Sequence, residues 1–443
     1  MKKVYLLLIV ALLFSGLFSV WAQNKSAKTR LIPEKIWRIP KGNNFEDAES
    51  EYSYRRMAES DNLVMFWHKS YGNNPMKNSD SSKRFDVDKA MAECERFYNY
   101  YVNDLKLVQK GASHTDNYKL LIFVIGGDEN TAFGGGSEDV GILWTPAVRI
   151  NKAPYGALAH EIGHSFQYLS ARDSGTGPRG PIMEMSAQYM LWQVYPEWMT
   201  FENYHLVDFL KGTHYAFLHP ENMYHSPYVL EYWSNKHGIE FWGNLCRSTQ
   251  EGEDVVQTYK RITNLSQDAF NDEIFDANRH FITWDLPRVD SVAKPYRNMH
   301  KTKLTEVEDG WFQVDSINAP QNYGYNGIPL QVPERKKVTL HFKGIANSAG
   351  YTNVKRDKAG WRYGFVAYLK NGESVYGKIH KKADDTVTFK VPKNTANLWL
   401  VVSGAPTEHW SLPSGRRNRD KPKPEEEQWP YKIKLTGTSI LSN

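Results

Sequence analysis

The chain has 443 residues, of which 41% are hydrophobic and 24% are charged, and its formal net charge is +5. This length exceeds one ordinary hydrophobic core, so we expect two or three domains. The composition excludes a disordered chain, and so small a net charge argues against nucleic acid or an anionic membrane surface as the partner.

The first 22 residues have the pattern of a secretory signal peptide. Lys2 and Lys3 precede an apolar run that ends near Val20, and Ala22 completes a small-residue cleavage site. We therefore expect an exported protein, periplasmic or extracellular. No later stretch is apolar over the roughly 18–20 residues that span a bilayer, so we expect no membrane span.

Residues 31–150 alternate between strand patterns and one helix. Short apolar runs at 63–67, 120–124 and 140–144 predict buried strands. Apolar side chains recur every three or four positions from Met91 to Leu105, which predicts an amphipathic helix. The glycines 134–136 precede the third run, and because no Lys-Ser/Thr follows them, we interpret them as a flexible turn.

The remaining chain divides into a helical part and a β-rich part. Helical patterns cover 201–210, 228–237, 239–247 and 267–283. Past Pro287, strand patterns occur at 338–342, 365–369, 386–390, 398–402 and 431–435, and Asn371-Gly372 predicts a hairpin turn. The fold class is therefore α+β. We expect a first domain over residues 31–290, with halves 31–150 and 151–290, and an independently folded β-sandwich over 300–443.

Only two cysteines occur, Cys94 and Cys246. They are too few for a disulfide framework or a cysteine metal site. Export would allow them to pair, whereas the helical, aromatic surroundings of both suit buried free thiols equally well.

The segment from Ala157 to Tyr168 contains the motif His160-Glu161-x-x-His164. On a helix, residues four apart share a face, so both imidazoles can face one metal ion. Glu161 lies beside them, placed to accept a proton from the attacking water rather than to bind the metal. An apolar stripe on another face suits the core: Leu158, Ile162, Ser165, Phe166 and Leu169.

A second helix is expected to supply a third ligand. Glu184 is the only acidic residue between Asp173 and Glu197, and its neighbours are mostly apolar. A carboxylate in such surroundings is costly unless a cation meets it, and a zinc ion held by two histidines would be that cation. Gln188 follows one turn later on the same face, where its amide oxygen could accept a hydrogen bond from His160.

This spacing, His160-Glu161-x-x-His164 followed by Glu184, resembles the thermolysin-like arrangement of the gluzincin metallopeptidases. The resemblance implies a zincin-like catalytic domain, one Zn²⁺ held by His160, His164 and Glu184, and Glu161 as the catalytic base. It also implies a mixed sheet whose edge strand, here 140–144, lines the substrate cleft. More widely, the exported chain, the HEIGHSFQY segment and the β-rich tail resemble the secreted avirulence-protein-like gluzincins of bacteria.

A gluzincin also needs a hydrogen-bond donor for the oxyanion that develops on the attacked carbonyl. The stretch from His214 to Tyr228 is rich in Tyr and His, the usual donors in this class. We predict that His225 and Tyr228 are these donors. Packing in the core or at the surface is the competing interpretation for each aromatic residue of the stretch.

Two functions compete at this point. The first is a secreted zinc metalloendopeptidase acting on protein or glycoprotein substrates. The second is a non-catalytic glycan- or protein-binding protein with a structural zinc site, which the 14 tryptophans and the expected β-sandwich favour. In both, the C-terminal domain could contact glycans. Glu161 favours the enzyme, because a purely structural site has no use for a carboxylate at that position.

Overall fold

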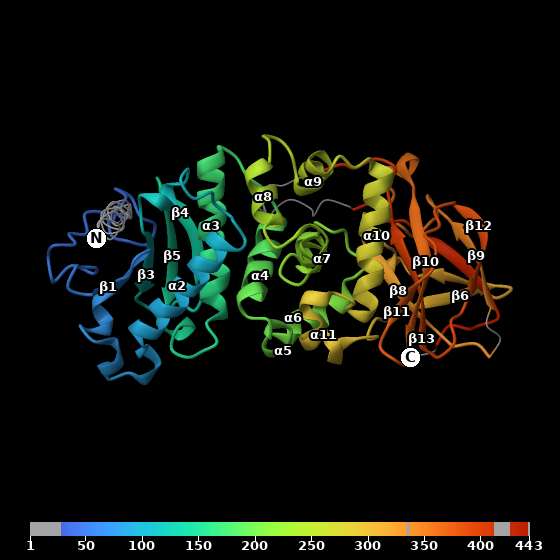
Figure 1. Cartoon of the computed structure of the whole chain (residues 1–443), viewed down its shortest axis with the longest axis horizontal. Helices are drawn as coiled ribbons and strands as arrows, with labels where there is room; N and C mark the ends of the chain where they lie inside the picture. Colours follow the sequence, from blue (N-terminus) through green and yellow to red (C-terminus); the bar gives the residue numbers. More distant parts are fainter. Residues whose placement is uncertain (1–27, 335–336, 412–425, 442–443) are drawn as a thin grey trace, which may run out of the picture.

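The computed structural model describes residues 28–334, 337–411 and 426–441. Three parts follow one another along its longest axis (Figure 1): a five-stranded sheet, a set of helices, and two further sheets. The predicted signal peptide at residues 1–22 lies outside the described residues. In the described part of the chain, no helix is both long and apolar enough to cross a bilayer.

The first sheet has the strand order β1-β2-β3-β5-β4. Its three inner strands run parallel, whereas β1 and β4 run antiparallel to their neighbours at the two edges. Every residue of the inner strands is buried, which explains their continuous apolar runs. The strands are β1 (Met57–Glu59), β2 (Leu63–Trp67), β3 (Leu120–Ile125), β4 (Phe133–Ser137) and β5 (Val140–Pro146).

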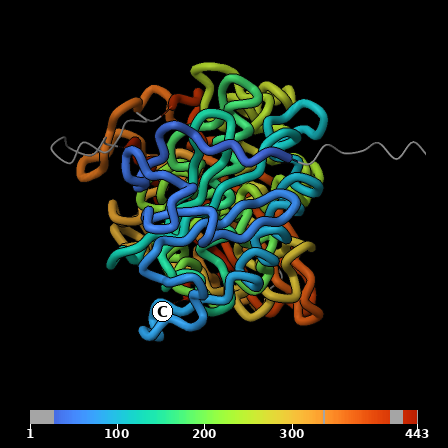
Figure 2. Tube along the Cα trace, turned by 90° about the vertical axis from the view of Figure 1, so that its left-hand side faces the viewer, coloured from blue at the N-terminus to red at the C-terminus, as the bar shows by residue number. Residues whose placement is uncertain are grey.

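Different segments cover the two faces of this sheet. Leu63 and Met65 of β2 pack into the same apolar core as the helices α2 and α3, whereas Val64 and Phe66 point to the other face. That other face is covered by the chain before β1, which runs across it in blue in Figure 2. The sheet is therefore buried between the helices and the first described residues.

The interpretation of glycines 134–136 as a flexible turn is wrong. They form most of β4, which pairs antiparallel with β5 and makes β4, not the predicted 140–144, the edge strand. The absence of side chains lets the strand lie against α3: a Cβ atom on Gly134 would lie 1.9 Å from the carbonyl oxygen of Glu161, and one on Gly136 would lie 2.1 Å from the Tyr168 ring. Close packing, not turn formation, is the reason for the glycines.

The helices fill the middle of the molecule. The predicted segments 228–237 and 267–283 are α7 and α10 without change of bounds, whereas the predicted 201–210 divides between α5 and α6. The helices are α2 (Val87–Asn103), α3 (Gly156–Ser174), α4 (Ile182–Val194), α5 (Trp198–Phe201), α6 (Asn203–Lys211), α7 (Tyr228–His237), α8 (Phe241–Ser248), α9 (Val255–Thr263), α10 (Gln267–Thr283) and α11 (Asp290–Ala293).

Two antiparallel sheets form the C-terminal part and share one apolar core. Their strand orders are β11-β10-β13-β8 and β12-β9-β14-β7-β6. The predicted hairpin at Asn371-Gly372 is confirmed, since it joins β10 to β11 and Gly372 has a φ of 91°. The strands are β6 (Leu304–Glu308), β7 (Trp311–Val314), β8 (Tyr325–Leu330), β9 (Lys337–Gly344), β10 (Trp361–Leu369), β11 (Ser374–Tyr376), β12 (Asp384–Lys390), β13 (Thr395–Gly404) and β14 (Tyr431–Thr436).

The four-stranded C-terminal sheet also packs against the helices. Tyr325, Val366 and Trp399 belong to the same buried cluster as the side chains around α3 and α4. Hydrogen bonds reinforce this contact, because Asn271 of α10 donates to the carbonyl of Pro406 at 2.9 Å. The α+β class that the sequence predicts is therefore present, and its helical and C-terminal parts share a core.

Both cysteines are buried free thiols. Burial raises the pKa of each thiol well above its ordinary value, so both remain protonated at neutral pH. Of the two interpretations that the sequence left open, the structure therefore has the unpaired one.

Candidate metal centre

Helix α3 carries the predicted motif and is held in place by its apolar face. Leu158, Ile162 and Phe166 are fully buried, and the Ser165 hydroxyl donates to the carbonyl of Ile142 in β5 at 3.0 Å. The helix ends at Gly175, whose φ of 80° closes it in the left-handed conformation. The predicted apolar stripe is therefore confirmed, and the opposite face of α3 is left for the polar residues.

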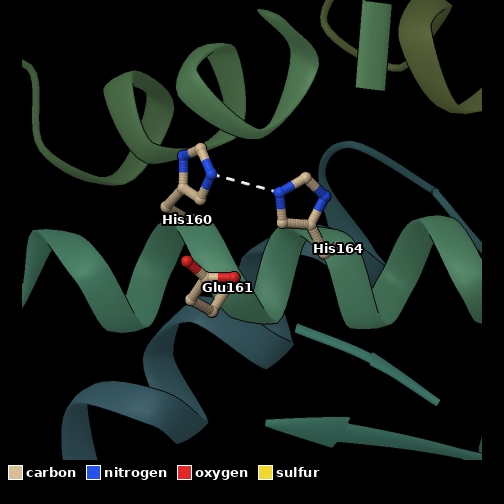
Figure 3. A group of neighbouring side chains, drawn as sticks. All are labelled: His160, Glu161 and His164. Atoms are coloured by element: carbon tan, nitrogen blue, oxygen red, sulfur yellow. Dashed lines mark hydrogen bonds between the residues drawn. The ribbon is translucent and has the colours of Figure 1, made fainter. Parts of the chain in front are cut away.

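The two histidines of the motif point toward one another from one side of α3 (Figure 3), and their Nε2 atoms lie 3.1 Å apart. Oε2 of Glu184, in the first turn of α4, lies 3.2 Å from Nε2 of His160 and 3.1 Å from Nε2 of His164. These three atoms form a nearly equilateral triangle. A regular tetrahedron with edges of this length has its centre about 1.9 Å from each vertex, close to the roughly 2.0–2.1 Å of a Zn–N bond.

Two glutamines fix the orientation of the imidazoles. Oε1 of Gln188 lies 3.0 Å from Nδ1 of His160, and Oε1 of Gln167 lies 2.8 Å from Nδ1 of His164. Because an amide oxygen can only accept, each Nδ1 must carry the proton. Both Nε2 atoms of the neutral rings then present lone pairs to the centre of the triangle. The hydrogen bond between Gln188 and His160, predicted from the sequence, is confirmed.

The glutamine amides are themselves fixed by their nitrogen atoms. Nε2 of Gln167 donates to the carbonyl of Met183 and to the hydroxyl of Ser186, both at 2.8 Å. Nε2 of Gln188 donates to the carbonyl of Tyr224 at 3.0 Å and to Nε2 of His205 at 3.1 Å. The amide nitrogen of each glutamine donates to these other acceptors, which leaves the amide oxygen of the same side chain facing a histidine.

Three acceptor atoms at this separation require a positive charge between them. Burial acts to lower the pKa of His164, yet the hydrogen bond and the charge of Glu184 raise it overall. Burial likewise acts to raise the pKa of Glu184, but the two imidazoles, which donate hydrogen bonds from Nε2 when they are protonated, hold it far below its ordinary value. A proton or a metal cation can supply this charge, and two imidazoles with a carboxylate are a ligand set that suits zinc.

Glu161 leaves α3 on a different side from the two imidazoles (Figure 3), although its nearest carboxylate oxygen and their ring nitrogens all lie within 4.8 Å of one another. Burial raises the pKa of Glu161, while a hydrogen bond from the backbone N–H of Gly134 acts against that rise. A carboxylate with a raised pKa beside a polarised water is suited to accept its proton.

The structure corrects both predicted oxyanion donors. Tyr228 is fully buried among Trp192, Phe209 and Trp284, so its hydroxyl cannot reach the centre. His225 contacts His205, with their Nδ1 atoms 2.7 Å apart, and is therefore separated from His160 by both His205 and Gln188. Neither residue faces the ligand atoms.

Tyr224, the neighbour of His225, lies at the centre instead. Its ring stacks on that of His160 with 6.4 Å between ring centroids. Burial, together with the charge of Glu184 and a hydrogen bond to it, raises the pKa of Tyr224 to about 12. Its hydroxyl is therefore a neutral donor, and the charge of Glu161 also acts on it. The aromatic stretch contained the right residue, but its sequence has no periodicity that singles out Tyr224.

A cavity of about 240 Å³ opens beside the His160 end of α3. Three of its lining residues have no motif in the sequence and were not predicted: Arg149, Glu202 and Tyr204. Glu202 lies between α5 and α6, two short helices at the place where the sequence predicts a single helix over 201–210. The rest of the lining is Thr131, Ala132, Gly156, Ala157, His160, Glu161, Gln188, Leu191, His205 and Tyr224.

The chain belongs to the DUF6055 family, a family of unknown function, whose model matches residues 22–442. Among curated proteins, no sequence matches it significantly.

Solved structures with some similarity include the CBM22-1 xylan-binding domain of Xyn10C from Paenibacillus barcinonensis, at 11% identity and a TM-score of 0.17, over 32% of this chain and 82% of that one. The M60 catalytic domain with the CBM51-1 and CBM51-2 domains of ZmpB from Clostridium perfringens matches at 11% identity and a TM-score of 0.29, over 88% of this chain and 60% of that one. Scores this low carry no argument about fold or function.

Proposed function

We propose that this protein is a zinc-dependent metallopeptidase that hydrolyses internal peptide bonds in protein or glycoprotein substrates. The observation that carries the proposal is the triangle formed by Nε2 of His160, Nε2 of His164 and Oε2 of Glu184, with edges of 3.1–3.2 Å. Two neutral imidazoles locked by glutamines, with one carboxylate, would hold one zinc ion per chain and leave a fourth position open.

The surrounding architecture supports a zincin-like assignment for residues 31–290. A mixed sheet lies against the motif helix α3, and β4 is an antiparallel edge strand whose Gly134 contacts Glu161. An extended substrate could add to the free edge of β4, as the gluzincin resemblance implies.

For residues 300–443, the two antiparallel sheets with a common core support a β-sandwich, which could contact glycans. We also propose export to the periplasm or the extracellular space.

Each residue of the centre has a separate task in this proposal. A bound zinc ion would supply the positive charge that polarises both the attacking water and the substrate carbonyl. Glu161 accepts the proton of that water and delivers it to the leaving amine. The Tyr224 hydroxyl donates a hydrogen bond to the oxyanion, the role that the sequence predicts for His225 and Tyr228.

The test compares the full-length protein with its Glu161→Gln variant on casein and on a mucin-type glycoprotein, with and without a chelator. Glutamine keeps the volume but cannot accept a proton, so hydrolysis should fall by at least about 10²-fold while zinc content stays unchanged. Glu197→Gln, an exposed carboxylate in the same half of the chain, is the matched control and should remain fully active.

Equal hydrolysis by wild type and Glu161→Gln would contradict the mechanism. Bound zinc without any hydrolysis in the wild type would instead favour the glycan- or protein-binding protein with a structural zinc site.

A further inference from the structure

Glu202 brings a second carboxylate to the cavity beside the candidate metal centre. Its Oε2 atom accepts a hydrogen bond from the indole N–H of Trp198 at 2.7 Å, which fixes the side chain against the end of α5. The side chain is nevertheless 28% exposed, and it lines the same cavity as His160 and Glu161. Glu202 is therefore a positioned carboxylate that a ligand in the cavity can reach.

This carboxylate forms no direct ion pair with a Lys or Arg side chain of the described residues. In the described part of the chain, no Lys or Arg nitrogen lies within 4.0 Å of it, and the nearest basic atom is Nε2 of His205 at 3.7 Å. That nitrogen accepts a hydrogen bond from Gln188, and burial lowers the pKa of His205 to about 4, so the ring is neutral. Arg149 also lines the cavity, and its positive charge acts on Glu202 from beyond 4.0 Å, while its Nε donates to the carbonyl of Asn130 at 2.6 Å.

Two aromatic faces complete the lining. Tyr204 is 57% exposed and Tyr224 is 40% exposed, and both border the cavity. Each ring is held by a histidine, since Tyr204 packs on His205 with centroids 4.1 Å apart and Tyr224 stacks on His160. A carboxylate without a directly paired Lys or Arg, in a cavity bordered by exposed tyrosine rings, attracts an ammonium or guanidinium ion.

We propose that this cavity is a subsite for a cationic group of the substrate, with Glu202 as its counter-ion. This inference rests on the proposed peptidase function, because the cavity is continuous with the residues assigned to the reaction. Two parts of a peptide carry such a group: its N-terminal ammonium, and a Lys or Arg side chain near the cleaved bond. Both present the same chemistry to Glu202, and the experiment separates them.

Binding can be measured without turnover by calorimetry on the Glu161→Gln variant of the full-length protein. Three peptides of one sequence serve as probes: one acetylated with an internal Lys, one with a free N-terminus and norleucine for Lys, and one acetylated with norleucine. At least one cationic peptide should bind about 10-fold more tightly than the neutral one, and the peptide that does so identifies the source of the cation.

The preference should disappear when Glu202→Gln is added to this background, and it should persist when Glu197→Gln is added instead. Glutamine at position 202 can still accept from Trp198, so the fold of the segment is kept. Equal binding of all three peptides, or equal competition by a neutral oligosaccharide, would overturn the inference.

Hydrolysis by the otherwise unmodified protein then distinguishes the two proposals. Glu202→Gln should lose the preference for the cationic peptide, and Glu202→Arg should reverse it toward an acidic one, while zinc content stays constant. If the wild type cleaves basic, neutral and acidic peptides alike, the subsite is wrong and the peptidase stands. If it cleaves none of them, the peptidase fails, and the binding measurement alone decides whether the cation subsite exists.

Discussion

The backbone N–H of Gly134 donates a hydrogen bond to the carboxylate of Glu161, and a Cβ atom at position 134 would lie 1.9 Å from the carbonyl oxygen of the same glutamate. The edge strand β4 and the motif helix α3 thus meet at a point where only glycine fits. The same contact that allows the approach also orients the proposed base.

Gly134→Ala should therefore damage both stability and activity. The added methyl group meets backbone rather than a movable side chain, so β4 must shift, at a cost of about 1–3 kcal/mol in the free energy of unfolding. Urea unfolding and peptide hydrolysis measure the two effects. Gly135→Ala is the matched control, because its Cβ would meet only the Trp144 ring at 3.9 Å, and it should change neither quantity appreciably.

Metal content gives a second prediction. Purified protein should contain about one zinc per chain by elemental analysis, and His160→Ala and His164→Ala should contain far less. Glu184→Gln should bind zinc at least about 10-fold more weakly and also lose rate, because it removes the anionic ligand. Full zinc occupancy in both histidine variants would exclude the site.

The stability of the protein should fall in mild acid because of His300. This ring is buried, and burial lowers the pKa of His300 from 6.5 to about 3. Below pH 6.5 the imidazole of His300 is protonated in the unfolded chain but stays neutral in the folded chain. The stability contributed by neutral His300 is therefore complete above pH 6.5 and declines as the pH falls toward 3. At pH 5 the loss is about 2 kcal/mol.

His300→Gln removes this titration while retaining a group that can contact the Tyr325 hydroxyl, which lies 2.7 Å from Nε2 of His300. Between pH 7 and pH 5, the wild type should lose about 2 kcal/mol more than the variant in urea unfolding. Parallel losses in the two proteins would show that His300 does not resist protonation.

Truncation tests the domain boundary. The sequence predicts independent folding of residues 300–443, but Tyr325, Val366 and Trp399 of the C-terminal sheet lie in the same cluster as the helices. A chain that ends near residue 290 should expose that surface of α10 and aggregate, as size-exclusion chromatography would show. A monodisperse, zinc-binding fragment would restore the prediction of independent domains.

The local pattern of apolar residues in the sequence was enough to predict much of this fold. The strand β2 and the helices α7 and α10 have the bounds that their apolar periodicity predicts. The ligand face of α3 and the Gln188 contact also follow from spacing, because helix geometry converts sequence separation directly into direction.

Three features could not be predicted from local sequence pattern. The glycines of β4 carry no side chains, so their strand pattern exists only through the contact with α3. The segment that leads into α7 has no repeating geometry, so spacing could not tell whether Tyr224, His225 or Tyr228 faces the histidines. Glu202 could not be predicted because its role depends on a cavity between elements distant in sequence.

The position of Tyr228 has a consequence for engineering. Its hydroxyl is enclosed by aromatic rings and has no hydrogen-bond partner among the described residues. An oxygen stripped of water without a replacement partner costs about 1–3 kcal/mol, so Tyr228→Phe should raise the melting temperature while leaving peptide hydrolysis unchanged. A lower melting temperature would mean that the hydroxyl does have a partner. The residue first proposed as a catalytic donor is thus a place where the protein can be made more robust by deleting a single atom.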